Sequence, residues 1–165
     1  MVADHSTEGD VRHPEGTITT ISTDTTSSDE IILRGHPGIG PRVEGEALVS
    51  QHGFSARYDL NRKTGFFSRE THDLYGQSII GKVLVHTTGK GGVATAWAFL
   101  DMREHGTAPL AIIFQLANPI MAQGAALADL PLMDRLDPDP LAVIESGDWL
   151  IVDPPAGEVR VRKPR

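Results

Sequence analysis

Apolar residues change their spacing within the segment Gly81–Met102, and this change predicts a strand, a turn and a helix. Val83–Val85 is a short apolar run followed by glycines, which is typical of a buried strand. Beyond the glycines, apolar residues recur with the spacing of one helix face, at Val93, Ala96, Trp97 and Leu100. Gly106 stands where a left-handed residue would end this helix. We therefore predict a helix over 93–105 with Trp97 buried in the core.

The rest of the chain shows the same mixture of strands and short helices. Apolar runs bounded by glycine and proline predict strands at Ile31–Leu33, Val43–Val49, Leu110–Phe114, Trp149–Val152 and Glu158–Val161. Asn118 and Pro119 are typical of a helix N-cap and first helical residue, ahead of a small-residue helix over 121–128 whose backbone could approach a neighbour closely. Asp139 and Pro140 predict a further helical turn through residue 144. Strands of mixed direction with two or three short helices indicate a mixed α/β or α+β layered domain over residues 31–165.

The turn Thr87–Gly92 places bare backbone amides and the ammonium of Lys90 at the amino end of the predicted helix. Free N–H groups, the positive end of the helix dipole and one lysine together favour binding of an anion. Glycines also serve a tight turn for purely geometric reasons. The sequence leaves both interpretations open, an anion site and a plain connector.

Charge and composition narrow the class of protein. Residues 1–30 carry seven acids and one base, a net charge of −6, whereas the rest of the chain is nearly neutral at −1. Nine of the twelve residues Thr17–Ser28 are serine or threonine, so we expect Met1–Glu30 to be a disordered tail. His5 and His13 could bind a metal, but we interpret them as solvated tail residues and expect no metal site in this chain.

Three further features of the sequence limit the possible partners. No basic stripe suggests nucleic acid, and no apolar run approaches the roughly 20 residues of a membrane span. The polar, acidic start does not resemble a signal peptide. We therefore expect a soluble, cytoplasmic protein without nucleic-acid or membrane partners.

The sequence contains no self-contained catalytic set. The chain has no cysteine, so it offers no thiolate to an iron–sulfur cluster, and it has neither a Cys–His pair nor an HExxH motif. His72-Asp73 is compatible with an acid–base pair or with a structural turn. Asp134-Arg135 is compatible with a buried ion pair or with a clamp in which Arg135 grips a substrate carboxylate.

Several motifs resemble the small, swivelling subunit of the aconitase X family. They follow the family's order along residues 33–161, and they are Val43–Ser50, His72–Val85, Gly89–Gly91, Gly124–Arg135 and Gly147-Asp148. The resemblance implies a swivelling β/β/α domain that closes over a large partner subunit. It also implies a hydro-lyase, since archaeal members resemble phosphomevalonate dehydratase and bacterial members include cis-3-hydroxy-L-proline dehydratase. An iron–sulfur cluster is expected on the large subunit, and no cofactor on this chain.

The turn, the Asp134-Arg135 pair and the resemblance together indicate which residues form the site. The substrate-binding residues would be Gly89, Lys90, Gly91, Gly92 and Arg135. The family has a serine directly after its Gly-Lys-Gly, the suspected proton acceptor, whereas this chain has Gly92 there. The remaining candidates for proton transfer are Thr88 and Thr95 near the turn, and Ser68 in a Ser-Arg-Glu run similar to that around the catalytic serine of ordinary aconitase.

Two functions therefore stay open at the level of sequence. The first is the small half of an aconitase-X-type hydro-lyase that dehydrates a small hydroxy acid, phosphomevalonate-like or cis-3-hydroxy-L-proline-like, together with a large subunit. The second is a ligand-binding or regulatory module that has kept the fold and lost catalysis with the serine. Phe54 and Phe66-Phe67 stand in a long connection, where they would form an exposed apolar patch or fold back onto the core.

Overall fold

The computed structural model describes residues 30–165. The predicted tail Met1–Glu30 therefore lies outside the described residues, with the exception of Glu30. Glu30 begins the first strand instead of ending the tail, because it stands opposite Arg162 in an antiparallel pair and its carboxylate accepts from the Arg162 guanidinium at 2.9 Å.

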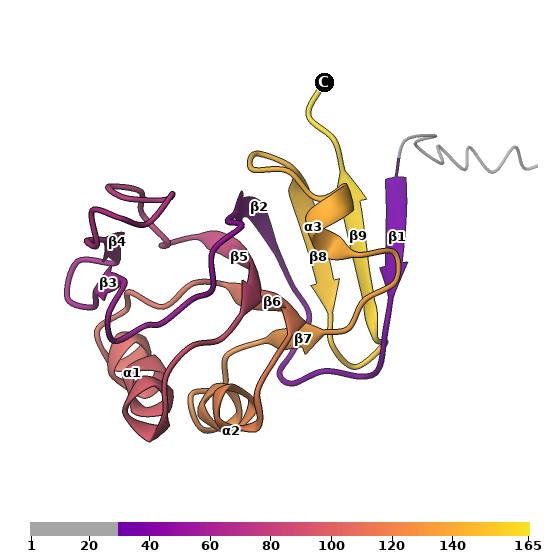
Figure 1. Cartoon of the computed structure of the whole chain (residues 1–165). Helices are drawn as coiled ribbons and strands as arrows, with labels where there is room; N and C mark the ends of the chain where they lie inside the picture. The colour runs from indigo at the N-terminus through magenta and orange to yellow at the C-terminus, as the bar shows by residue number, and fades with distance from the viewer. Residues whose placement is uncertain (1–29) are drawn as a thin grey trace, which may run out of the picture.

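Seven strands form one sheet, and a small hairpin lies outside it (Figure 1). In spatial order the sheet contains β1 (Glu30–Arg34), β9 (Glu158–Arg162), β8 (Trp149–Asp153), β2 (Val43–Val49), β5 (Lys82–Thr88), β6 (Ala111–Leu116) and β7 (Leu132–Asp134). The hairpin consists of β3 (Leu60–Asn61) and β4 (Phe66–Phe67). The helices are α1 (Val93–Glu104), α2 (Pro119–Leu127) and α3 (Pro140–Val143). The predicted mixed α/β class with two to three short helices is confirmed.

The direction of the strands divides the sheet into two halves. Strands β2, β5, β6 and β7 are parallel, whereas β8, β9 and β1 continue the sheet by antiparallel pairing. The two edges of the sheet also meet, because Arg34 pairs with Asp137 and Ile39 pairs with Leu132 in isolated bridges. The sheet therefore curls back on itself, and the carboxyl ends of the four parallel strands open on one side.

The two faces of the sheet bury two separate cores, as the alternation of side chains along a strand requires. Along β5, Val83 and Val85 point into the interior of the curled sheet, whereas Leu84 faces the layer that holds α1 and α2. In Figure 1 both of these helices lie below the sheet, and α3 lies on its other side. Phe54 and Phe67 are buried in the helix-side core, and Phe66 is only half-exposed, so this connection folds back onto the core.

Helix α1 turns a different face to the core from the one predicted. Trp97 is 58% exposed, so the prediction that it is a core residue is wrong. The helix buries Thr95, Ala96, Ala98, Phe99 and Met102, so Ala96 is the one residue of the predicted face that is buried. Apolar residues occupy both sides of this helix, so spacing alone did not distinguish the faces. The end of the helix is confirmed, since Gly106 has a φ of +69°.

Helix α2 begins and packs as its sequence indicates. Asn118 is the N-cap, and its side chain accepts a hydrogen bond from the Met121 amide at 2.9 Å. Gly124 meets α1, where an added Cβ would lie 2.7 Å from the Ala96 Cα atom. The small residues of α2 thus allow the two helix backbones to approach closely.

Candidate functional site

The loops that carry the candidate site residues lie at the carboxyl ends of the parallel strands. Chain order places Ser50 after β2, Gly89–Gly92 after β5, Ala117-Asn118 after β6 and Arg135 after β7. Because these strands are parallel and adjacent, their carboxyl ends share one edge of the sheet. Ligands of open α/β sheets bind outside this edge.

The turn Gly89–Gly92 is held by two neighbouring segments. The Phe54 amide donates to the Thr88 carbonyl at 2.8 Å, and the Lys90 amide donates to the Phe54 carbonyl at 2.7 Å. From the other side, the Asn118 amide group donates to the Gly89 carbonyl at 3.0 Å. Gly89 packs so closely against Met121 that a Cβ has no room, and Gly91 adopts a φ of +103° that favours glycine. The glycines therefore serve both the turn geometry and close packing.

Two cations meet at one buried carboxylate beside this turn. Asp59 is fully buried and lies 3.7 Å from the Lys90 ammonium and 3.3 Å from the Arg69 guanidinium. The Ser55 amide also donates to Asp59, at 2.8 Å. The Lys90 side chain is 45% exposed and that of Arg69 51%, so both cations keep a face toward solvent. The three formal charges sum to +1, which favours an anion at this surface.

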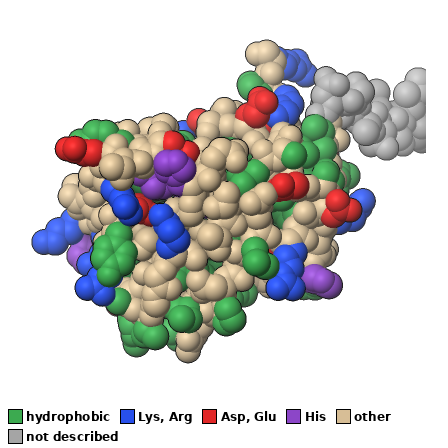
Figure 2. Space-filling view, viewed as in Figure 1, with side chains coloured by type: hydrophobic (Ala, Val, Ile, Leu, Met, Phe, Trp, Pro, Cys, Tyr) green, Lys and Arg blue, Asp and Glu red, His purple; other side chains and the backbone are tan. Residues whose placement is uncertain are grey.

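The amino end of α1 adds backbone donors to the same turn. Gly92 is the N-cap and carries no capping side chain, and Val93 and Ala94 are exposed. Amides in the first turn of a helix have no partner within the helix, and they lie at the positive end of its dipole. Figure 2 shows lysine, arginine and histidine side chains gathered on the part of the molecule where β3, β4 and α1 lie.

The three candidate hydroxyl groups lie in different surroundings. Thr95 is buried beneath the turn, with its Oγ1 atom 3.5 Å from the Ser55 hydroxyl. Thr88 is half-buried, and its hydroxyl donates to the neighbouring Gly89 carbonyl at 3.4 Å. Ser68 is exposed, and its amide donates to the Asp59 carbonyl at 2.9 Å. The fold thus brings the Ser68-Arg69 segment to Asp59, the carboxylate that also pairs with Lys90, although Arg69 and Lys90 are distant in sequence.

Arg135 occupies a separate place on the same edge. Its side chain is 64% exposed and lies 3.7 Å from Asp134, so the buried ion pair considered from the sequence is not present. Arg135 lines a cavity of about 370 Å³ together with Asn118 and Pro37. The alternative function for Arg135, a clamp for an anionic group, is compatible with this exposure.

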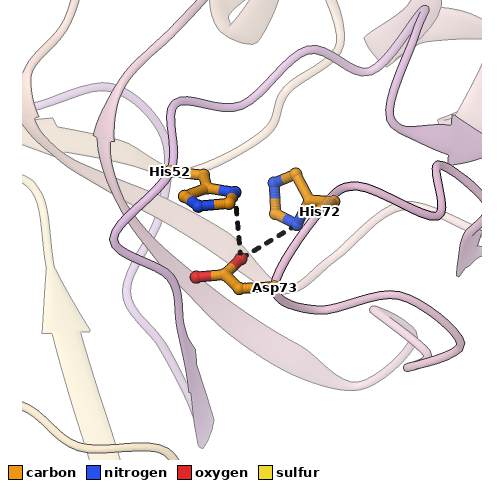
Figure 3. Close-up of side chains that lie close together, drawn as sticks. All are labelled: His52, His72 and Asp73. Carbon is orange, nitrogen blue, oxygen red and sulfur yellow. Dashed lines mark ion pairs between the residues drawn. The ribbon is translucent and has the colours of Figure 1, made fainter.

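A cluster of histidines follows β2 and precedes β5. His72 Nδ1 lies 3.0 Å from Asp73 Oδ1, and His52 Nδ1 lies 3.7 Å from the same oxygen (Figure 3). Burial lowers the pKa of His72, and the Asp59 and Asp73 carboxylates oppose this effect. Burial also lowers the pKa of the nearby His86, to about 4. Both buried imidazoles are therefore neutral near pH 7.

The carboxylate of this cluster is itself held by hydrogen bonds. The Ser50 hydroxyl donates to Asp73 Oδ1 at 2.6 Å, and the Gln51 amide donates to Oδ2 at 3.1 Å. Burial favours the neutral acid, but these donors outweigh it and hold the pKa of Asp73 below its usual value. His72-Asp73 is consequently more than a structural turn, since it belongs to a network that joins the ends of two segments.

The arrangement as a whole is that of a small α/β domain with a cation-lined, glycine-rich turn at the carboxyl edge of its parallel strands. Residues 32–161 match the family model of the aconitase X swivel domain, so the chain belongs to that family. A phosphomevalonate dehydratase small subunit of Methanocella arvoryzae is 35% identical over 129 residues, which cover 78% of this chain and 98% of the relative. The corresponding subunit of Methanosarcina acetivorans is 37% identical over 123 residues, 74% of this chain and 85% of the relative.

The fold agrees with a solved structure from the same family. The crystal structure of Thermococcus kodakaraensis aconitase X in its holo-form matches with a TM-score of 0.75 and 32% identity, covering 81% of this chain and 99% of that chain. Among the residues that the structure of our chain describes, no helix has the length and apolar character needed to cross a membrane.

Sequence reasoning missed several residues of this edge. Asp59 and Arg69 lie in the long connection 51–67 and just beyond it, and no local pattern linked them to Lys90. The Ser-Arg-Glu run at Ser68 was the one available signal. No sequence motif pointed to His52, because the spacing between His52 and its neighbours His72 and Asp73 matches no known metal-binding or catalytic motif.

Proposed function

We propose that the chain is the small subunit of an aconitase-X-type hydro-lyase and that it binds the anionic part of a phosphorylated hydroxy acid such as phosphomevalonate. The observation that carries the proposal is the turn Gly89–Gly92 with Lys90 and Arg69, which presents two cations and free amides beside each other. The family match and the names of the relatives support the reaction class. Cytoplasmic location stays a prediction.

Dehydration removes a proton and expels a hydroxyl group, and this chain contributes positioning and electrostatics to that step. The Lys90 ammonium and the Arg69 guanidinium hold a phosphate or carboxylate group, and the first amides of α1 donate to it. Asp59 keeps both cations in place by pairing with them from below. Closure of a large subunit over this surface excludes water and strengthens each of these contacts.

The iron–sulfur cluster of the family belongs to the large subunit in this proposal. The chain contains no cysteine and so provides no thiolate ligand, which does not fit a cluster bound here. We therefore derive no step of the reaction through the cluster.

Proton transfer has three candidate groups on this chain, and their surroundings rank them. Ser68 is exposed next to Arg69, where a bound anion would lie. Thr88 is half-buried at the end of β5. Thr95 is buried under the turn and supports it through Ser55. We infer that Ser68 is the group best placed to reach the substrate, with Thr88 as the next.

The experiment is a kinetic comparison in the assembled enzyme. The variant Lys90→Ala, co-expressed with a large subunit, should lower kcat/KM for phosphomevalonate about 30-fold, which corresponds to the loss of about 2 kcal/mol from a desolvated charge contact. Lys82→Ala is the matched control, because Lys82 also pairs with a carboxylate, Glu46, but stands at the opposite end of β5. Equal kcat/KM for Lys90→Ala and the unmodified enzyme would contradict an anion site at this turn.

A second function, a ligand-binding module without catalysis, is favoured by one observation. Gly92 replaces the family's serine at an exposed N-cap. A Cβ at Gly92 would meet no atom within 4 Å, and its φ of −110° suits any residue, so Gly92→Ser fits without distortion. A large gain in dehydratase activity of Gly92→Ser would support loss of the proton acceptor in this chain. Unchanged activity of a turning-over enzyme would place the acid–base group elsewhere.

A further inference from the structure

Three potential metal ligands converge on one point beside β2. Nδ1 of His52, Nδ1 of His72 and a carboxylate oxygen of Asp73 all lie within 4.8 Å of one another. Figure 3 shows both imidazole rings beside Asp73, with one nitrogen of each facing the same carboxylate oxygen. Two imidazoles and one carboxylate form a ligand set used by zinc sites.

The contacts of His72 Nδ1 place two acceptors beside each other. The Leu74 amide donates to Nδ1 of His72 at 3.2 Å, so this nitrogen carries a lone pair. The same nitrogen lies 3.0 Å from the Asp73 carboxylate oxygen, which also carries lone pairs. Two acceptors at this distance repel each other, and either a proton on Nδ1 or a metal ion between them removes the repulsion. An unprotonated nitrogen is also the form that binds a metal ion.

The ligands are held in position by a second layer of contacts. The Ser50 hydroxyl donates to Asp73, and it accepts from the His52 amide at 2.9 Å, so one buried side chain ties two of the ligands together. His86 Nδ1 lies 3.1 Å from the His52 carbonyl. The His72 ring stacks on Phe67 with 4.5 Å between centroids. Such outer contacts orient first ligands in metal sites.

The two ring nitrogens of His72 differ in their contacts. His72 is buried, and its Nε2 atom has no hydrogen-bond partner within the described part of the chain. The ring is therefore not placed there by a hydrogen bond of Nε2, and the polar contacts that it makes are all at Nδ1, which faces the cluster.

We propose that His52, His72 and Asp73 bind a divalent transition-metal ion of the zinc class. Zinc–ligand distances near 2.0–2.2 Å imply about 3.3 Å between ligand atoms in a tetrahedral site. The His72–Asp73 pair is already near this value, and rotation of the half-exposed His52 side chain brings the third ligand in. Three protein ligands leave a fourth position open for water or a substrate oxygen.

The site lies near the Lys90 turn, since His52 is two residues from Phe54, whose carbonyl accepts from the Lys90 amide at 2.7 Å. It also departs from the expectation, drawn from the sequence, that this chain holds no metal.

The test is binding of Zn²⁺ to the full chain after treatment with a chelator and removal of the chelator. Calorimetry should give a site that His52→Ala weakens at least about 10-fold. His52 suits this test because its side chain is half-exposed and its one polar contact among the described residues is with Asp73. The variant should therefore leave the packing of the hydrophobic core unchanged. Asp73→Asn should weaken binding as well.

His105→Ala is the matched control. His105 has an exposure close to that of His52, 49% against 48%, and it also lies near a carboxylate, Asp101, at 3.3 Å. It lacks a second imidazole beside it, so its removal should leave Zn²⁺ affinity unchanged. In an NMR titration, the ring signals of His52 and His72 should shift at one equivalent of Zn²⁺, and those of His105 should not. Equal Zn²⁺ affinity of His52→Ala and the unmodified chain, or unshifted His72 signals, would overturn the proposal.

Discussion

Asn118 joins α2 to the glycine-rich turn Gly89–Gly92, and its replacement tests how this turn is supported. Its side chain makes two hydrogen bonds, accepting from the Met121 amide at 2.9 Å and donating to the Gly89 carbonyl at 3.0 Å. Asn118→Ala removes both. Loss of an N-cap costs about 1 kcal/mol, and loss of one neutral, part-buried hydrogen bond costs about 1 kcal/mol. We therefore expect the free energy of unfolding to fall by about 2 kcal/mol.

A second variant separates the two bonds. Asn118→Ser keeps a hydroxyl acceptor for the cap, but the side chain is too short to reach the Gly89 carbonyl, so its loss should be about 1 kcal/mol. Gln123→Ala on the exposed side of α2 is the control and should stay within about 0.5 kcal/mol. The assay is urea unfolding followed by far-ultraviolet circular dichroism. At about 2–4 °C per kcal/mol, thermal unfolding of Asn118→Ala should shift down by about 4–8 °C.

The outcome that refutes this reasoning is specific. If Asn118→Ala unfolds within about 0.5 kcal/mol of the unmodified chain, neither bond contributes as the geometry implies. If Asn118→Ser loses as much stability as Asn118→Ala, the cap contributes nothing and the estimate for it is wrong.

Two further predictions concern α1 and its contact with α2. Phe99→Ala should lower the free energy of unfolding by about 3–5 kcal/mol because Phe99 is fully buried, whereas Trp97→Ala should lower it by less than about 1 kcal/mol. Urea unfolding of both variants measures these losses. A larger loss for Trp97→Ala than for Phe99→Ala would show that the helix face is assigned wrongly. Gly124→Ala should destabilise the chain by about 1–3 kcal/mol, because the added methyl group meets the Ala96 backbone. This loss opposes the preference of about 1 kcal/mol for alanine over glycine in a helix. A rise in the melting temperature would show that the helices are farther apart than described.

The local features of this fold could be predicted because each depends on residues close in sequence. The glycine-rich turn after β5 was predicted from an apolar run and a change of period. Gly106 and Asn118 were recognised as helix ends because their conformational and hydrogen-bonding roles are local. The family motifs extended the same approach to the whole domain.

The prediction that was wrong and the site residues that were not identified both depend on tertiary contacts. The buried face of α1 is the one that packs Phe99 and Met102 into the core on the helix side of the sheet, a contact that the spacing within α1 does not contain. The meeting of Lys90 with Asp59 and Arg69 depends on how the connection after β2 folds back. No pattern along the chain encodes these placements, so the sequence identified the turn but not its carboxylate or its second cation.

Turnover by the reconstituted pair tests the central claim most directly. The purified chain and a co-expressed aconitase X large subunit are assayed separately and together for dehydration of phosphomevalonate. Our account predicts that each protein alone is inactive, that the mixture is active, and that activity saturates at one small subunit per large subunit. Tight ligand binding by the lone chain, combined with no turnover and no co-elution of the mixture at micromolar concentration, would contradict it.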